Sequence, residues 1–188
     1  MIDSIMEKRG KEKSMQKFKS ILIVILMFFL VYFLQVNFFS WFNIAGVMPN
    51  LFITLVLFVG LFIGKKIGIV YGLCVGIILD SLVGKVIGPN AILLGIVGYL
   101  GEVYDRNFSK NKKISVILLN IVCTVLYEVI LYCFYIIKFK INIEVWLFIE
   151  KLVIENIYNT LILIIFFKPL FQLGSYLERN FKDRLFLT

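Results

Sequence analysis

The side chains of greatest chemical interest in this chain are carboxylates and amides that stand inside long apolar stretches. A charged group in the hydrocarbon of a membrane costs about 2.5–3.5 kcal/mol on insertion scales, so each such residue needs a reason to be there. The intramembrane polar positions are Asp80, Asn120, Glu128, Glu155 and Asn159. These residue types permit proton or ion transfer, but we expect structural hydrogen bonds between helices to be their main use.

The same inventory argues against an enzyme. The chain has no histidine, which removes the commonest general base and metal ligand. Cys74, Cys123 and Cys133 lie in apolar runs and form no CxxC pair, so zinc and thioredoxin-like sites are not expected. The sequence contains no GxSxG, HExxH or P-loop motif. We therefore expect no catalytic residue, no metal site and no cofactor.

Asp80 has the most unusual surroundings in the sequence. It belongs to a row with one member every fourth residue, whose other members are Gly68, Gly72, Gly76, Gly84 and Gly88. An interior glycine costs a soluble helix roughly 1 kcal/mol relative to alanine, whereas small residues in a membrane let helix backbones pack closely. The row therefore predicts a close helix–helix contact, with a neighbour from this chain or from another protein.

Composition indicates which elements must position these residues. Hydrophobic residues make up 61% of the 188 residues and charged ones 17%, and the apolar residues gather in long runs. Runs of about 18 or more nearly uncharged residues are typical of transmembrane helices. We expect an all-α, polytopic integral membrane protein, a bundle of six transmembrane helices at residues 21–41, 45–64, 67–83, 91–103, 114–137 and 146–167.

The two ends of the chain differ from the membrane domain, residues 21–168. Residues 1–20 are a basic tail, and Lys168-Pro169 is expected to end the sixth span. Leucine and phenylalanine then recur at helical spacing over residues 169–188, which is typical of an amphipathic helix on the membrane surface; a partner-binding helix is the alternative.

Charge distribution predicts the orientation in the membrane. With both termini in the cytoplasm, 16 lysines and arginines lie on the cytoplasmic side and four on the outer side. The positive-inside rule therefore favours cytoplasmic N- and C-termini. The net charge of +8 is then better explained by anionic lipids than by nucleic acid.

The position of Asp80 along its span predicts a role at the outer side. It follows Ile67 by 13 residues, which is about 20 Å of helix. There the carboxylate can accept hydrogen bonds from the free N–H groups at a helix start, where the helix dipole also favours an anion. The two candidate starts are Pro49-Asn50 and Pro89-Asn90. A carboxylate that reaches the head groups and is simply solvated is the alternative.

The fifth and sixth spans are expected to share a buried polar seam. Lys151 and Glu155 are four residues apart and can pair on one helix face, and Asn159 continues that face. Glu128 of the fifth span is expected to lie near them. Hydrogen bonding between the two helices is favoured over ion transport.

The order of these motifs resembles one protein family. Four segments carry the resemblance: Pro49-Asn50-Leu51, Gly76-Ile77-Ile78-Leu79-Asp80 with Gly84, Gly88-Pro89-Asn90-Ala91, and Gly98-Tyr99-Leu100-Gly101. Over roughly Gly46–Arg106 they resemble the rod shape-determining protein MreD family, from which Ile92 and the inserted Pro89 depart. The resemblance implies a six-span, non-catalytic scaffold in the bacterial cytoplasmic (inner) membrane. It further implies binding to MreC and, through MreC, an influence on MreB filaments, RodA, its class B penicillin-binding partner, peptidoglycan synthesis and cell shape.

A substrate-binding component of an energy-coupling-factor vitamin transporter is the alternative function. Such components are also small six-span proteins, and they often dock through an Ala-x-x-x-Ala surface on the first span. Here Ile21–Leu30 has no face of small residues. The expected outer loops also lack a dense set of polar and aromatic groups for a ligand. Both observations argue against this alternative.

Overall fold

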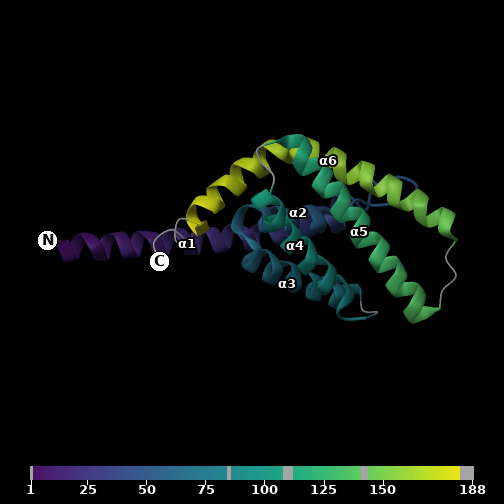
Figure 1. Cartoon of the computed structure of the whole chain (residues 1–188), viewed down its shortest axis with the longest axis horizontal. Coiled ribbons are helices and arrows are strands. Elements are labelled where there is room, and N and C mark those ends of the chain that lie inside the picture. Colours follow the sequence, from purple (N-terminus) through teal and green to yellow (C-terminus); the bar gives the residue numbers. More distant parts are fainter. Residues whose placement is uncertain (1, 84–85, 108–111, 141–143, 183–188) are drawn as a thin grey trace.

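A computed structural model describes residues 2–83, 86–107, 112–140 and 144–182 (Figure 1). Within these ranges the chain is all-helical, with one isolated bridge between Ile44 and Val47, so the all-α prediction is confirmed for them. The helices are α1 (Ile2–Phe33), η1 (a π-helix, Leu34–Phe38), α2 (Leu51–Ile63), α3 (Lys65–Val83), α4 (Pro89–Asn107), α5 (Lys113–Phe139) and α6 (Val145–Lys182).

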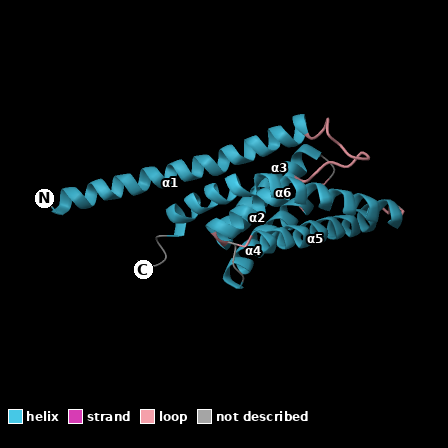
Figure 2. Ribbon diagram, turned by 90° about the horizontal axis from the view of Figure 1, so that it is seen from above, coloured by secondary structure: helices cyan, strands magenta, loops and turns pink. Residues whose placement is uncertain are grey.

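Three of the described helical segments are long and apolar enough to cross a membrane: Ser14–Phe38, Lys113–Phe139 and Val145–Phe181. Leu51–Ile63 is a shorter apolar helix. These helices support a membrane protein, while the six-span arrangement and its orientation stay a prediction. Figure 2 shows α1 running along one side of the other helices and extending well past them.

α2 is the centre of the bundle. All 13 of its residues are buried, and it packs against α1, α3, α4, α5 and α6. A helix that is apolar on every side suits a position surrounded by other helices or by lipid, and here the other helices surround it. The second span was expected to begin at residue 45, but the helix begins at Leu51. Ala45 and Gly46 have positive φ, so the backbone before α2 is not helical.

α6 differs most from its prediction. The expectation that the helix ends at Lys168-Pro169 is wrong, because α6 continues through Pro169 to Lys182. A proline inside a helix removes one hydrogen bond and usually bends it, and Figure 1 shows α6 bending over the bundle. Burial of the following segment stabilises the continued helix, as its contacts show.

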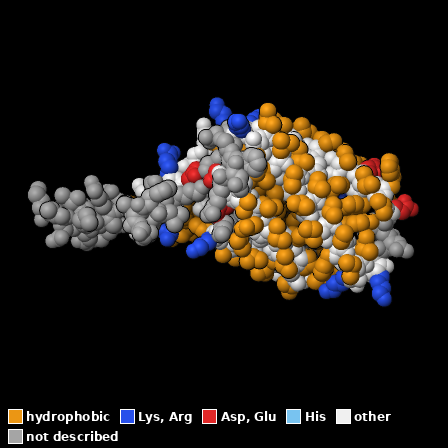
Figure 3. All heavy atoms as spheres, in the orientation of Figure 1, with side chains coloured by type: hydrophobic (Ala, Val, Ile, Leu, Met, Phe, Trp, Pro, Cys, Tyr) orange, Lys and Arg blue, Asp and Glu red, His pale blue; other side chains and the backbone are white. Residues whose placement is uncertain are grey.

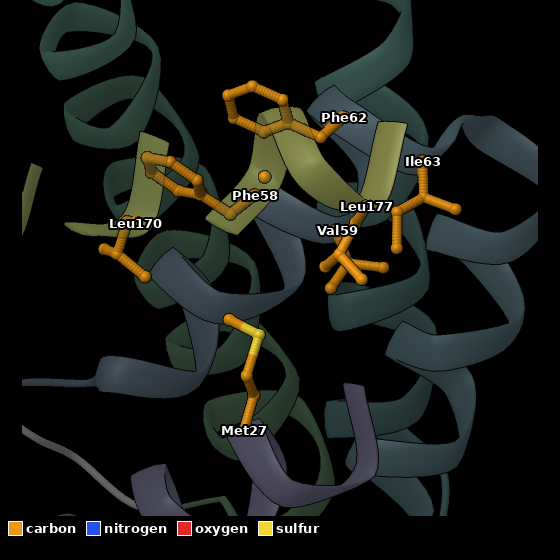
Figure 4. A pocket seen from close by; sticks show the side chains of 8 residues that line it. Met27, Phe58, Val59, Phe62, Ile63, Leu170 and Leu177 are labelled. Atoms are coloured by element: carbon orange, nitrogen blue, oxygen red, sulfur yellow. The ribbon is translucent and has the colours of Figure 1, made fainter. Parts of the chain in front are cut away.

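The segment after the bend packs on protein through its apolar face. Leu177 is buried in a cluster with Val24 and Ile63, and Leu173 and Phe181 pack against this cluster. The residues that suggested a membrane-surface helix therefore cover α1 and α2, while residues 183–188 lie outside the described ranges. Figure 4 shows where this segment meets Met27 and Phe62 around a very small apolar gap. Asn180 Nδ2 also donates to Ser20 Oγ, at 2.9 Å.

The outside of the molecule is strongly apolar. Figure 3 shows hydrophobic side chains covering most of the visible body, with lysines and arginines toward its ends. Trp41 and Trp146 are 86% and 74% exposed, as aromatic residues at a membrane interface would be. Such a surface fits a lipid environment far better than water.

Candidate functional site

The carboxylate of Asp80 lies at the start of α4, although the side chain comes from the last turn of α3. Oδ2 accepts hydrogen bonds from the backbone N–H groups of Gly88, at 2.8 Å, and Ala91, at 3.2 Å. Oδ1 accepts from Asn90 twice, from its backbone N–H at 3.2 Å and from its Nδ2 at 2.8 Å. The residue is only 1% exposed. Four donors and the positive end of the α4 dipole thus compensate this buried charge.

The local sequence explains how the chain reaches this geometry. Gly88 has φ +128°, a conformation that side chains rarely adopt, so glycine suits this turn. Pro89 is the first residue of α4, where its missing N–H leaves no donor unsatisfied. Asp80 and α4 are separated by a short connection, of which residues 84–85, including the predicted site residue Gly84, lie outside the described ranges.

The glycine row places α3 directly against α4 of the same chain. A Cβ atom added to Gly68, Gly72 or Gly76 would overlap backbone atoms of α4. The residues that meet are Gly68 with Gly98, Gly72 with Leu94, and Gly76 with Ala91. The two helices are therefore antiparallel and in backbone contact over three successive steps of the row. This contact, which sequence reasoning could not assign to a partner, aims Asp80 at the start of α4.

The start of α2 is also held by side chains, but by neutral ones. The backbone N–H of Asn50 donates to Asn159 Oδ1 of α6, at 2.8 Å. The N–H of Leu51 donates to Gln35 Oε1 at 3.1 Å, and Gln35 Nε2 donates to the carbonyl of Pro49 at 2.6 Å. Sequence reasoning missed Gln35. The only signal for it was a polar side chain at the C-terminal end of the first apolar run.

A chain of buried polar groups connects the helices behind these starts. Thr54 Oγ1 donates to Asn120 Oδ1 at 3.1 Å, and Asn159 Nδ2 donates to Thr124 Oγ1 at 3.4 Å. All four side chains are buried. These bonds join α2, α5 and α6 in the middle of the apolar core, where a hydrogen bond has little competition from water.

Tyr127 of α5 extends this network to the start of α4. Its hydroxyl donates to Asn90 Oδ1, and the ring is 4% exposed. Asn90 thus contacts both Asp80 and Tyr127 through its amide. Neither Tyr127 nor the two threonines had been expected from the sequence, because tyrosine and threonine, unlike asparagine, are ordinary residues of an apolar run and give no separate signal.

The seam between α5 and α6 contains an ion pair between the helices. Lys151 Nζ lies 2.9 Å from Glu128 Oε2 and 3.9 Å from Glu155 Oε2. Glu128 and Glu155 are 5% and 2% exposed. Lys151 therefore bonds to the glutamate of α5 more closely than to the residue four positions along its own helix.

These arrangements are suited to holding helices together. Each of Asp80, Asn120, Glu128 and Asn159 bonds to another helix, or to the start of one. Among the described residues, no three Cys, Asp or Glu side chains are grouped to hold a metal ion. We infer positioning, rather than chemical turnover, as the use of these residues.

Comparison with known proteins identifies the family. The family model described as rod shape-determining protein MreD matches residues 15–177, which include the glycine row, both helix starts and the α5–α6 seam. Neither the search of curated proteins nor the search of solved structures gave a match. Because the match covers most of the chain, this protein belongs to the MreD family.

Proposed function

We propose that this protein is a non-catalytic membrane scaffold of the bacterial cell-elongation machinery. Membership of the MreD family indicates a role in rod shape determination, and the family match over residues 15–177 is the observation that carries the proposal. The inter-helix contacts of the buried polar residues support it, because they fit a scaffold that must hold a shape. The exposed apolar surface is consistent with residence in the cytoplasmic membrane.

The proposed direct partner is MreC. Through MreC the protein would link MreB filaments to peptidoglycan synthesis by RodA and its class B penicillin-binding partner. This assignment rests on the family alone. Anionic lipids are proposed as further partners of the basic cytoplasmic segments.

Depletion and co-purification test this function. Cells that lose the protein are expected to become round, and tagged protein is expected to co-purify with MreC from detergent extracts. Normal rods after deletion, together with tight binding of a vitamin by the purified protein, would overturn the proposal in favour of a transporter component.

The proposed topology has six spans with both termini in the cytoplasm. The 16-to-four distribution of basic residues supports it, and so does Figure 1, in which the start of α1 and the end of α6 lie at the same side of the molecule. In a cysteine-free background, a cysteine at Asn43 should react with a membrane-impermeant maleimide in intact cells. A cysteine at Ser14 should react only after lysis, and the reverse pattern would contradict the orientation.

A further inference from the structure

A half-open cavity lies between α5 and α6, apart from the two anchored helix starts. Its volume is about 310 Å³, at the lower end of the range for small-molecule sites. Glu128 and Lys151 are its charged lining residues. The others are Leu131, Tyr132, Tyr135, Leu147 and Phe148. These residues come from the second half of α5 and the first two turns of α6, and Figure 1 shows the two helices diverging toward these ends.

The charged residues present two opposite charges side by side in the cavity wall. The side chain of Lys151 is 50% exposed and that of Glu128 is 7% exposed, although the two form an ion pair at 2.9 Å. A lysine ammonium has three donors, and a carboxylate can accept more than one hydrogen bond. The pair can therefore bind an anionic group at Lys151 and a cationic group at Glu128 together. A zwitterion is the ligand that such a pair complements.

The rest of the wall is apolar and largely aromatic. Tyr132 of α5 and Phe148 of α6 stack with their ring centroids 3.9 Å apart. Both helices thus contribute aromatic surface beside the ion pair, and this surface forms part of the apolar wall of the cavity. Leu147, at the same cavity, is 55% exposed toward the outside of the bundle. The cavity therefore has an ion pair that can bind a charged ligand, and an apolar surface that connects this pair to the outside of the bundle.

Depth in the membrane indicates the source of the zwitterion. The 27 residues of α5 span about 40 Å, which exceeds a hydrocarbon core of about 30 Å. Lys151 lies six residues after the start of α6 at Val145, or about 9 Å along the helix. Glu128 lies 11 residues, or about 17 Å, before the end of α5 at Phe139. The ion pair therefore lies below the interface that the exposed Trp146 marks, with Lys151 nearer to the head groups and the half-open cavity as the way in.

We propose that this cavity binds the head group of an amine-bearing zwitterionic phospholipid, of the phosphatidylethanolamine type. The lipid phosphate contacts Lys151, its ammonium donates to Glu128, and its acyl chains lie along the exposed apolar faces of α5 and α6. Glu155, 3.9 Å from Lys151, keeps the lysine beside the cavity. The site is independent of the MreC assignment, because it needs only this chain and a membrane.

Native mass spectrometry of the full-length protein tests the proposal. Purified protein is titrated with phosphatidylethanolamine, phosphatidylcholine and phosphatidylglycerol that carry identical acyl chains. Phosphatidylethanolamine is expected to bind about tenfold more tightly than either of the others. The quaternary ammonium of phosphatidylcholine has no N–H to donate to Glu128, and phosphatidylglycerol has no cation.

Matched variants locate the binding. Lys151→Met and Glu128→Gln are each expected to remove the tenfold preference, whereas Lys138→Met and Glu150→Gln, which alter exposed charges of the same helices outside the cavity, are expected to keep it. The exchanged pair Glu128→Lys with Lys151→Glu retains an ion pair between the helices but reverses its direction. With Glu155→Gln added, so that the new glutamate has no carboxylate beside it, this variant should unfold at the wild-type temperature yet lose the preference, which separates loss of recognition from loss of folding.

Three results would overturn the proposal. One is equal binding of the three lipids, and another is a preference for phosphatidylglycerol. The third is a preference for phosphatidylethanolamine that survives both Lys151→Met and Glu128→Gln. The expected result is a preference that disappears in the two cavity variants and the exchanged pair, and persists in the two controls.

Discussion

The starts of α2 and α4 both have backbone N–H groups that need an acceptor, and the two starts obtain it in different ways. Both helices begin after a Pro-Asn pair or within it, and both expose backbone N–H groups inside an apolar bundle. At α4, one carboxylate accepts four hydrogen bonds from residues only eight to eleven positions away. At α2, the two acceptors are amide oxygens 16 and 109 positions away in the sequence.

Because of this difference, the two sets of hydrogen bonds need different parts of the fold to be in place. The Asp80 anchor needs only α3, α4 and their glycine contact, so it can form as a local hairpin. The hydrogen bonds to Gln35 and Asn159 at the start of α2 can form only once η1 and α6 have packed beside it. Hydrogen bonds to a charged group are also roughly twice as strong as neutral ones. We therefore expect the hydrogen bonds at the start of α4 to contribute more to the free energy of unfolding than those at the start of α2. The bonds at α2 should instead depend on whether the whole bundle has assembled.

Among the variants that test this comparison, removal of the Asp80 carboxylate is expected to destabilise the protein most. Asp80→Ala leaves three backbone N–H groups and the Asn90 amide without their acceptor, and each orphaned buried group costs about 1–3 kcal/mol. We expect a strong loss of folded protein and of MreC co-purification, measured by thermal unfolding in detergent and by pull-down. Glu102→Ala, on the less buried C-terminal half of α4, is the control. Wild-type behaviour of both variants would mean that the carboxylate anchors nothing.

Disruption of the glycine contact should cause the second-largest loss of stability, because it shifts Asp80 from the start of α4 without removing the carboxylate. Gly72→Ala places a Cβ against the backbone of Leu94, and overpacking of this kind costs about 1–3 kcal/mol. Gly95→Ala is the matched control, since its Cβ would meet the Leu73 side chain at 3.3 Å and the nearest backbone atom, the Ile69 carbonyl oxygen, at an ordinary contact distance of 3.9 Å. Unfolding midpoints should fall in the first variant and change little in the second; equal shifts would argue against backbone contact at Gly72.

Removal of the Asn159 amide should cost less than removal of Asp80. Asn159→Ala leaves the Asn50 N–H without its acceptor and breaks the bond to Thr124, and one orphaned buried donor costs about 1–3 kcal/mol. Asn156→Ala, one turn earlier, removes a donor to Leu152 of the same helix and is the comparison variant. A smaller effect at Asn159 than at Asn156 would contradict the role assigned to the α2 start.

Gln35 should give the smallest effect of the series. It is half-buried, and Gln35→Ala removes neutral hydrogen bonds of about 1 kcal/mol each. The exposed Asn37, which bonds only within its own helical turn, serves as the control for loss of an amide. In chemical denaturation, the midpoint of the Gln35 variant should lie slightly but measurably below that of the Asn37 variant. A loss of unfolding free energy at Gln35 equal to that at Asp80 would contradict the proposed ranking.

The comparison also explains what the sequence could predict. Asp80 could be related to a helix start because it lies in a regular row and Pro89-Asn90 follows within ten residues. It could not be assigned between two starts, since both Pro-Asn pairs fit equally. Gln35 and Asn159 could not be paired with α2, because no local rule connects residues 109 positions apart.

The structure also departs from two local signals, one because of a tertiary contact and one because of backbone conformation. Pro169 predicted the end of a helix, but burial of Leu177 against α1 and α2 stabilises the continued helix. The apolar run from residue 45 predicted a longer second helix, yet the positive φ of Ala45 and Gly46 delays the start to Leu51. The family resemblance depended least on such contacts, because motif order is a property of the sequence itself.

Hydrogen–deuterium exchange of an Asp80→Asn variant tests the central claim most directly. Asparagine keeps the shape of the side chain but removes its charge and one acceptor oxygen, so the fold should survive. The backbone N–H groups of Gly88, Asn90 and Ala91 are expected to exchange markedly faster than in the wild type, while those of Asn50 and Leu51 keep their protection. Unchanged protection at residues 88–91 would contradict the account, and so would an equal loss of protection at both helix starts.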